Sequence, residues 1–254
     1  MPLRVPLRPS PLGHESPGMV EPGAGSYIHL EGSRARTAVM GVLNVTPDSF
    51  SDGGIHNASV DAAVTRIQEM VEEGADIIDI GGQSTRPGAE IVSLDQELSR
   101  VIPVISAARA LGVTACISID TFRAEVARQA VAAGADMIND VSGGLLDDNM
   151  LATAAQLMVP ICLMHYRGDP ATMQGLAHYP AGGVLATVAE ELEGRVAAAL
   201  RAGVPRWNIV VDPGIGFAKT AEQVQHRPSI FIFTLICGVV GCFVSGIRSH
   251  SELL

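Results

Sequence analysis

The fold is decided by one stretch of the chain, Val39-Met-Gly-Val-Leu-Asn-Val-Thr-Pro-Asp-Ser-Phe-Ser-Asp-Gly-Gly54. Its apolar part, from 38 to 43, predicts a short buried strand that breaks off at Asn44. The polar loop that follows contains Pro47 and two glycines. Loops longer than about 12 residues without secondary structure are usually functional or disordered. The specific polar composition favours a functional loop, because α/β enzymes build sites where a buried strand opens onto such a segment.

The alternation of an apolar strand, a polar loop and an amphipathic helix recurs along the chain. Further strands are predicted at 75–80, 115–120, 136–141, 160–165 and 208–212. Helices are predicted at 60–73, 93–110, 122–133, 148–157 and 183–201. Ser93 and Gln96 predict a capping box for the second helix, and Pro103 predicts a kink or break inside it. Six apolar strands that alternate with helices predict a parallel sheet covered on both faces.

Polar residues stand at the carboxyl ends of the predicted strands, where both the TIM barrel and the doubly wound sheet place their chemistry. They are Asn44, Asp79, Asp120, Asn139, His165 and Asp212. No Gly-x-Gly-x-x-Gly segment opens a helix after the first strand, which disfavours a dinucleotide-binding sheet. The predicted fold is therefore α/β, an incomplete (β/α)8 TIM-barrel type with about six βα units.

Three parts of the chain are predicted from these patterns. Residues 1–36 carry six prolines and predict a flexible N-terminal extension, 37–220 form the partial barrel, and 221–254 form an atypical apolar tail. The uncharged run 230–247 just reaches the length of a transmembrane helix. Three interpretations of it are open: a substitute for barrel elements, irregular packing on an apolar edge, or insertion into a membrane.

Composition limits the classes of function. Hydrophobic residues make up 47% of the 254 residues, and the formal net charge of −10 argues against a nucleic-acid surface. The four cysteines have no metal-ligand spacing, and Cys116 and Cys162 are predicted to be buried free thiols, which favours the reducing cytoplasm. The first 36 residues lack the pattern of a secretory signal. Organelle targeting by this extension stays open, although its three glutamates count against it.

Asp120, Asn139 and Asp212 are predicted to converge on the mouth of the barrel, since they end three of its strands. Two carboxylates and an amide suit a flat heterocycle with several ring N–H donors and a carbonyl. The alternative is that each is a capping or turn residue. Oxygen-bearing side chains of the first loop suit Mg²⁺ shared with a phosphate, or else form a solvated surface; they are Asn44, Thr46, Asp48, Ser49, Ser51 and Asp52.

Three other residues have two interpretations each. Arg86, with Ser84 and Thr85, is suited to bind an anion or carboxylate, or is a surface charge. His165 is a candidate general base or a hydrogen-bonded structural histidine. Lys219 is a candidate cation near the sixth strand, with the same ambiguity.

Together the motifs closely resemble the dihydropteroate synthase family. They follow the family's order and spacing over roughly Val39 to Thr220, and the first two are the most specific. The segments are Gly41-Val-Leu-Asn-Val-Thr-Pro-Asp-Ser-Phe-Ser-Asp-Gly-Gly54, Asp79-Ile-Gly-Gly-Gln-Ser-Thr-Arg-Pro-Gly88, Ile117-Ser-Ile-Asp-Thr121, Ile138-Asn-Asp-Val-Ser-Gly143, Met164-His165 and Asp212-Pro-Gly-Ile-Gly-Phe217.

The resemblance implies a transferase of folate biosynthesis. It would condense 6-hydroxymethyl-7,8-dihydropterin diphosphate with p-aminobenzoate to give 7,8-dihydropteroate and pyrophosphate, and sulfonamide drugs would compete with p-aminobenzoate. By resemblance, Asp120, Asn139 and Asp212 hold the pterin ring, and Asn44 contacts Mg²⁺ and the diphosphate. Packing against the pterin is assigned to Met164 and Phe217. The p-aminobenzoate pocket is assigned to Asp48, Phe50, Thr85, Arg86 and Pro87.

The sequence departs from the family after Thr220. The family continues with a Ser-Arg-Lys segment and an Arg-x-His segment that supply cations to the pterin and the diphosphate, and neither is present here. The 254-residue chain is therefore expected to be weakly active or inactive and prone to aggregate. A family-like homodimer is possible but compromised, and attachment to a membrane is not favoured. The alternatives are a non-catalytic pterin-binding chain and another pterin-site barrel, such as a methyltetrahydrofolate methyltransferase.

Overall fold

Six parallel strands form the centre of the molecule. The computed structural model describes residues 4–6, 27–29, 37–46, 56–83, 91–168, 172–180, 183–215, 217–220 and 223. The strands are β3 (Met40–Asn44), β4 (Ile77–Gly81), β5 (Cys116–Asp120), β6 (Met137–Asp140), β7 (Ile161–Met164) and β8 (Ile209–Asp212). Their order in the sheet is their order in the chain. This sequential order is that of a barrel wall, and it excludes the strand reversal of a doubly wound sheet.

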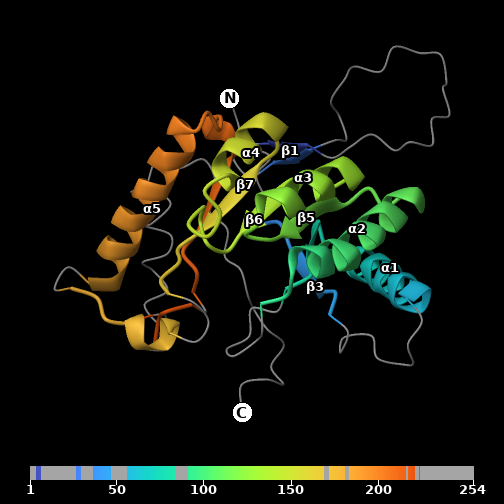
Figure 1. Ribbon diagram of the computed structural model, residues 1–254, viewed down its shortest axis with the longest axis horizontal. Helices are drawn as coiled ribbons and strands as arrows, with labels where there is room; N and C mark the ends of the chain where they lie inside the picture. The colour runs from blue at the N-terminus through green and yellow to red at the C-terminus, as the bar shows by residue number, and fades with distance from the viewer. Residues whose placement is uncertain are drawn as a thin grey trace.

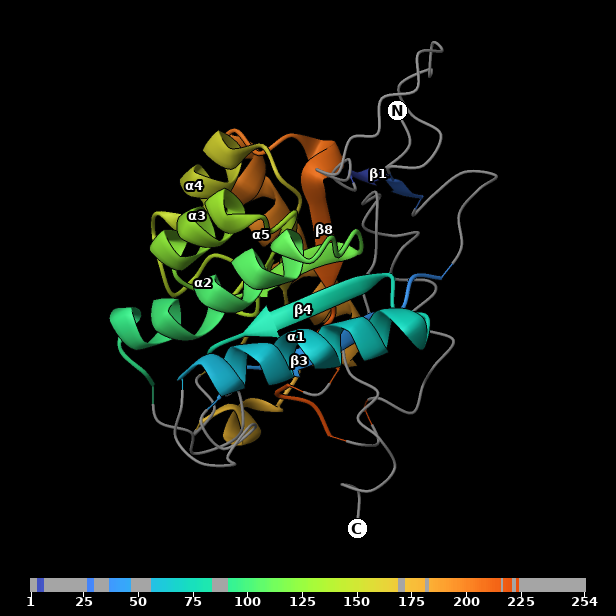
Figure 2. The ribbon, with the colours of Figure 1, turned by 90° about the vertical axis from the view of Figure 1, so that its right-hand side faces the viewer.

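Five helices follow the first five strands and lie side by side along the outside (Figure 1; Figure 2). They are α1 (His56–Glu72), α2 (Leu94–Ala110), α3 (Ala124–Ala133), α4 (Met150–Leu157) and α5 (Gly183–Arg201). Short 3-10 helices precede α5 and β8, namely η2 (Met173–Leu176) and η3 (Arg206–Asn208). The predicted incomplete TIM-barrel type is confirmed in this part of the chain.

The two faces of the sheet have different environments. On the outer face, buried strand residues share one apolar core with side chains from all five helices. On the inner face a separate apolar cluster contains no helix residue; it consists of Ile77, Cys116, Met137, Cys162 and Val210. The second face thus lines a barrel interior. The prediction of a sheet covered on both faces is wrong for the described helices, which cover only one face, because the other face of a barrel wall points inward. The prediction that Cys116 and Cys162 are buried free thiols is confirmed.

Several predicted boundaries shift by a few residues. Helix α1 begins four residues before the predicted start at 60. Helix α3 begins at Ala124, two residues late, because the Thr121 hydroxyl accepts the N–H of Arg123 at 3.1 Å and Arg123 is held extended as the N-cap. Asn44 belongs to its strand. Of the kink or break predicted at Pro103, the break is wrong: α2 continues through the proline, since buried side chains on both sides of it fix the helix against the core.

The predicted capping box of α2 is present. The N–H of Gln96 donates to the Ser93 hydroxyl at 3.2 Å, and the N–H of Ser93 donates to the Gln96 side-chain oxygen at 3.0 Å. Two backbone donors that the first helical turn leaves unpaired are therefore satisfied locally.

The repeated Gly-Ala-Asp segments at 74–76 and 134–136 have one structural role. Each glycine ends a helix at a positive φ, 105° and 127°. In the first segment the aspartate carboxylate accepts the N–H of Val39 at 2.9 Å, and the aspartate N–H donates to the Val39 carbonyl at 2.8 Å. The second segment makes the same two bonds with Ile117, at 2.9 and 2.8 Å. The repeat therefore fixes the start of one strand against the next.

The chain before the barrel contains structure that the sequence did not predict. Strands β1 (Arg4–Pro6) and β2 (Tyr27–His29) pair antiparallel within the expected N-terminal extension. The remainder of that extension and nearly all of the apolar tail lie outside the described residues. Among the helices that the structure does describe, none combines the length and apolarity needed to cross a membrane.

Candidate active site

The register of the strands places the predicted pterin residues on the inner face of the sheet. Alternate residues of a strand face the same side, so the interior is built in layers. The apolar cluster described above closes the N-terminal end. Toward the C-terminal end, Asp79 is paired with Ser118, Asp120 with Asn139, and Met164 with Asp212 on neighbouring strands. The prediction that strand-end residues gather at one end of the sheet is confirmed for these side chains.

Asp120 faces a glycine on the neighbouring strand β4. Its register partner on β4 is Gly81, and a Cβ atom there would lie 3.1 Å from Asp120 Oδ2. The half-buried Asp120 carboxylate makes no hydrogen bond with the described residues. Burial raises the pKa of Asp120 well above its ordinary value, and the charges of Asp79, Glu97 and Asp140 raise it further. Asp120 is therefore an acceptor available to a ligand, not a structural cap.

Asn139 is hydrogen-bonded to a buried carboxylate on strand β4. Its Nδ2 donates to Asp79 Oδ2 at 2.9 Å, and both side chains are buried. Burial raises the pKa of Asp79, while the adjacent Ser118 and Asn139 side chains oppose that rise. The second oxygen, Asp79 Oδ1, is shut away from solvent and has no hydrogen-bond partner within the described chain. The same holds for Ser118 Oγ.

Asp212 begins a tight turn that closes the site from the side of β8. Its Oδ1 accepts the N–H of Gly214 at 2.8 Å. Gly214 has a φ of 61°, and a Cβ atom there would lie 2.7 Å from the His165 carbonyl oxygen, so only glycine fits. The Met164 side chain packs against the same glycine. Phe217 is half-buried at the end of this turn, where its N–H donates to the Gly214 carbonyl at 3.0 Å.

His165 links the ends of β7 and β8 to α5. The Lys219 ammonium lies 3.1 Å from His165 Nδ1, and Glu191 Oε2 lies 2.8 Å from His165 Nε2. Because an ammonium can only donate, Nδ1 is the acceptor and the ring proton is on Nε2. Lys219 also donates to the carbonyls of Gly214 and Phe217, at 2.9 and 3.0 Å. The structural interpretation of His165 is therefore favoured over that of a general base.

Lys219 stabilises the turn after β8 through hydrogen bonds. Its three ammonium donors are all engaged, by His165 and two carbonyl oxygens. Burial lowers the pKa of Lys219 to about 8, and Asp212 opposes that change. Of its two interpretations, that of a cation free to bind a ligand is therefore not supported by these contacts.

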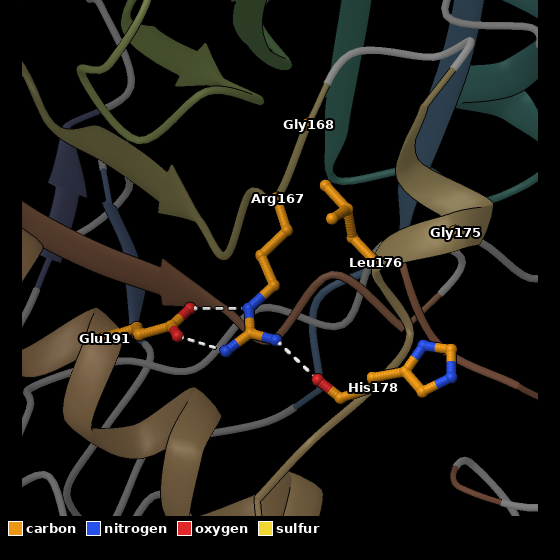
Figure 3. A pocket seen from close by; sticks show the side chains of 6 residues that line it. All are labelled: Arg167, Gly168, Gly175, Leu176, His178 and Glu191. Atoms are coloured by element: carbon orange, nitrogen blue, oxygen red, sulfur yellow. Dashed lines mark hydrogen bonds and ion pairs between the residues drawn. The ribbon is translucent and has the colours of Figure 1, made fainter.

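Arg167 extends this group toward the surface. It contacts the Glu191 carboxylate with Nε, at 3.0 Å, and with a terminal nitrogen, and it donates to the His178 carbonyl at 3.1 Å (Figure 3). Its guanidinium also stacks over the Tyr179 ring at 4.5 Å. The pocket drawn in Figure 3 is lined by Arg167, Gly168, Gly175, Leu176, His178 and Glu191. None of the predicted pterin residues lines it, and its one arginine is already paired.

The buried ring of His165 should make stability depend on pH. Burial, with the charge of Lys219, lowers the pKa of His165 to about 4 although Glu191 opposes the change. The unfolded ring binds its proton near pH 6.5, so between these values the unfolded state holds more protons and stability rises with pH. We expect this group to add about 3 kcal/mol to the free energy of unfolding from about pH 4 to about pH 6.5.

The measurement is urea unfolding of the chain and of His165→Gln at several pH values across that window. The glutamine variant should lose most of the rise, because its side chain does not titrate. His178→Gln is the matched control, since His178 is exposed and only its carbonyl contacts Arg167. An unchanged pH dependence in His165→Gln would contradict the prediction.

Asn44 stands apart from the other predicted residues. It ends the edge strand β3 on the same inner face, but its side chain is exposed. Among the described residues no group of three or more His, Cys, Asp or Glu side chains is placed to hold a metal ion. The predicted p-aminobenzoate residues Asp48, Phe50, Thr85, Arg86 and Pro87 lie outside the described residues.

A family model for pterin binding enzymes matches residues 40–228. The chain belongs to the pterin-binding enzyme family. Within the family, it is 56% identical over 188 residues to a dihydropteroate synthase from Synechocystis, covering 74% of this chain and 64% of that protein. It is 50% identical over 215 residues to a dihydropteroate synthase from Bacillus subtilis, covering 83% of this chain and 69% of that protein. The resemblance stated from the motifs is thereby confirmed.

Solved structures support the same assignment of fold. A dihydropteroate synthase from Xanthomonas albilineans, solved with 4-aminobenzoic acid, superposes with a TM-score of 0.75 at 44% identity, covering 85% of this chain and 75% of that one. One from Clostridium difficile, solved with pteroic acid, gives 0.76 at 38% identity, with coverages of 84% and 77%. Some curated relatives are much longer: the chain spans 25% of a folic acid synthesis protein from Schizosaccharomyces pombe, at 55% identity over 72% of this chain.

Sequence reasoning missed two features of this site. It placed Asp79 among the strand-end residues but gave it no role, although Asp79 contacts Asn139 from 60 positions away. It also gave no role to Glu97, which is fully buried on α2 and accepts the Thr121 hydroxyl at 2.6 Å, one residue after Asp120. A charged residue at a core position of a helix was the available signal for Glu97.

Proposed function

We propose that this chain acts as a dihydropteroate synthase, joining the pterin methylene carbon of 6-hydroxymethyl-7,8-dihydropterin diphosphate to the amine of p-aminobenzoate. The carbon–oxygen bond to the diphosphate breaks, and the amine loses a proton. The observation that carries the proposal is the convergence of Asp120, Asn139 and Asp212 on the inner face of one barrel end. The relatives solved with 4-aminobenzoic acid and pteroic acid support both substrate classes.

In this proposal the three residues bind and orient the heterocycle. The carboxylates of Asp120 and Asp212 accept ring or exocyclic N–H groups, and Asn139 adds an amide. Met164, buried beside Asp212, offers an apolar surface to the flat ring. The partly buried interior limits access of water, which would otherwise capture an electron-deficient methylene carbon.

No protein nucleophile is required, since the electron-rich pterin can stabilise a cation at its methylene group as the diphosphate leaves. The described cysteines agree with this. Cys116 and Cys162 lie in the apolar layer below the site, and burial raises the pKa of the Cys116 thiol. Neither is therefore suited to attack the substrate.

The role of magnesium stays a proposal. Mg²⁺ commonly takes one or two protein ligands and completes its shell with water and substrate phosphates. The exposed amide oxygen of Asn44, at the C-terminal end of β3, fits such a sparse donor set. A Mg²⁺ ion held there would neutralise charge on the diphosphate.

The test is a pair of measurements on the purified 254-residue chain. Isothermal titration calorimetry with pteroic acid measures binding, and release of pyrophosphate from the pterin diphosphate measures turnover. We expect binding, and only weak pyrophosphate release that depends on p-aminobenzoate, because the sequence departs from the family's pattern after Thr220. Binding without turnover would support the non-catalytic alternative, and absence of both would overturn the proposal. Sulfonamide competition should reduce turnover, as a Yersinia pestis relative has been solved with a sulfonamide drug.

Location and assembly also stay predictions. A cytoplasmic location is favoured by the composition, whereas relatives from Arabidopsis thaliana and Pisum sativum are named mitochondrial, which agrees with the organelle alternative. The homodimer is tested by sedimentation of the purified chain.

A further inference from the structure

The proposed function gives no role to two buried polar residues of the barrel interior, Asp79 and Ser118. Asp79 on β4, Ser118 on β5 and Asn139 on β6 each stand two residues after a member of the apolar layer, and Asp120 stands two residues beyond Ser118. A buried carboxylate is costly unless it is paired or hydrogen-bonded. Asp79 Oδ2 has a partner in Asn139, and Oδ1 has none in the described chain. A residue kept at such a cost inside the site is a candidate for function.

The contact between Asp79 and Asn139 decides which end of the amide faces the ligand. In this contact the NH₂ group of Asn139 donates to Asp79 Oδ2 at 2.9 Å, the orientation that an ionised carboxylate requires because it can only accept. Asn139 Oδ1 then points away from Asp79 and accepts no hydrogen bond from the described residues. Unlike Asp79 Oδ1, Asn139 Oδ1 is not closed off from solvent. The group that Asn139 leaves unpaired within the described chain is therefore a hydrogen-bond acceptor, its side-chain oxygen.

We propose that Asp79 is a positioning residue that locks the Asn139 amide with its oxygen toward the ligand, so that this part of the site selects a ring edge bearing an N–H donor. The inference rests on the proposed function, because it concerns the same pterin site. Without Asp79 the amide can rotate by half a turn and present NH₂ instead, which would favour a ring nitrogen that accepts. The specificity of a buried amide depends on such an orienting partner, since its two ends differ in chemistry and hardly in shape.

The decisive experiment exchanges the two side chains. Asp79→Asn keeps the shape but lets the amide at 139 adopt either orientation, and it should weaken pteroic acid binding about tenfold in calorimetry. Asn139→Asp places two carboxylates side by side and should bind at least as weakly. The double variant Asp79→Asn/Asn139→Asp restores a donor at 79 and an acceptor toward the ligand. It should bind pteroic acid about tenfold more tightly than Asn139→Asp.

Ser118→Ala is the control for the polarity of the layer, because the Ser118 side chain lies beside Asp79 and opposes the rise of its pKa but is not the group that contacts Asn139. Its affinity should stay within about twofold of the unaltered chain. Circular dichroism and urea unfolding show which variants fold. If Asp79→Asn does not fold, the comparison of the exchange variant with Asn139→Asp still decides, since a merely structural Asp79 would give no gain in affinity.

Three results would overturn the inference and leave the proposed function standing. A folded Asp79→Asn could bind pteroic acid as tightly as the unaltered chain, or the exchange variant could bind it no more tightly than Asn139→Asp. The third is a loss of affinity in Ser118→Ala equal to that in Asp79→Asn. The last would assign the effect to the polarity of the layer. Failure of the unaltered chain to bind pteroic acid would instead overturn the proposed function, and the inference with it.

Discussion

Asp120→Ala should weaken pterin binding by about 10- to 150-fold, because a hydrogen bond to a buried charged group contributes about 1.5–3 kcal/mol. The same variant should stay folded. Asp120 makes no hydrogen bond with the described residues, and burial with neighbouring carboxylates raises its pKa well above the ordinary value. Removing it relieves an unfavourable charge, so we expect the free energy of unfolding to be unchanged or to rise by up to about 1 kcal/mol.

Calorimetry with pteroic acid and urea unfolding together test this prediction. Glu193→Gln on the exposed side of α5 is the control, since it removes one negative charge without reaching the site. Ring N–H donors bind the ionised carboxylate, so the affinity of the unaltered chain should fall as the pH drops through the raised pKa of Asp120. The alanine variant should lose that dependence. An Asp120→Ala chain that is both unstable and tight-binding would show that Asp120 is structural.

Glu97→Ala should cost about 3–5 kcal/mol of the free energy of unfolding, the loss expected when one partner of a buried ion pair is removed. The Glu97 side chain is fully buried, pairs with Arg123 and accepts the Thr121 hydroxyl at 2.6 Å. The Arg123 guanidinium also donates to the Val92 carbonyl at 2.6 Å. Losing Glu97 would leave the arginine charge without its partner beneath the loop that follows Asp120.

Denaturant unfolding followed by circular dichroism measures this loss. Glu97→Gln keeps an acceptor for Thr121 and should cost less than the alanine variant. Glu125→Ala is the matched control, because its pair with Arg128 is exposed on the surface of α3 and should contribute no more than about 1 kcal/mol. Equal losses at 97 and 125 would contradict the idea that burial makes the difference.

The strands and helices could be predicted from the sequence because the signals are local. The apolar runs, the Ser93 capping box and the glycines that end helices each act within a few residues. The predicted helix boundaries were wrong where a tertiary contact competes with the local sequence pattern. The start of α3 is delayed by the Thr121 hydroxyl, and α2 continues through Pro103 because its neighbours are buried in the core.

The gathering of polar residues at one end of the sheet could also be predicted, but the contacts among them could not. Strand-end positions and motifs were enough to name Asp120, Asn139 and Asp212, since parallel strands end at one edge. The hydrogen bond between Lys219 and His165, 54 positions apart in the chain, has no signal in the sequence. The orientation of Asn139 by Asp79, across 60 positions, carries none either.

The parallel αβ repeat, the family and the residues at the barrel mouth follow from the amino-acid sequence, because each depends on short-range patterning and on motifs of fixed spacing. Which of those residues have unpaired groups follows from the packing of distant segments. Asp120 has room beside it because its register partner on β4 is Gly81, whereas the Lys219 ammonium is already bound by three acceptors. Whether a polar group is free depends on the groups that fold against it, and these come from distant parts of the chain.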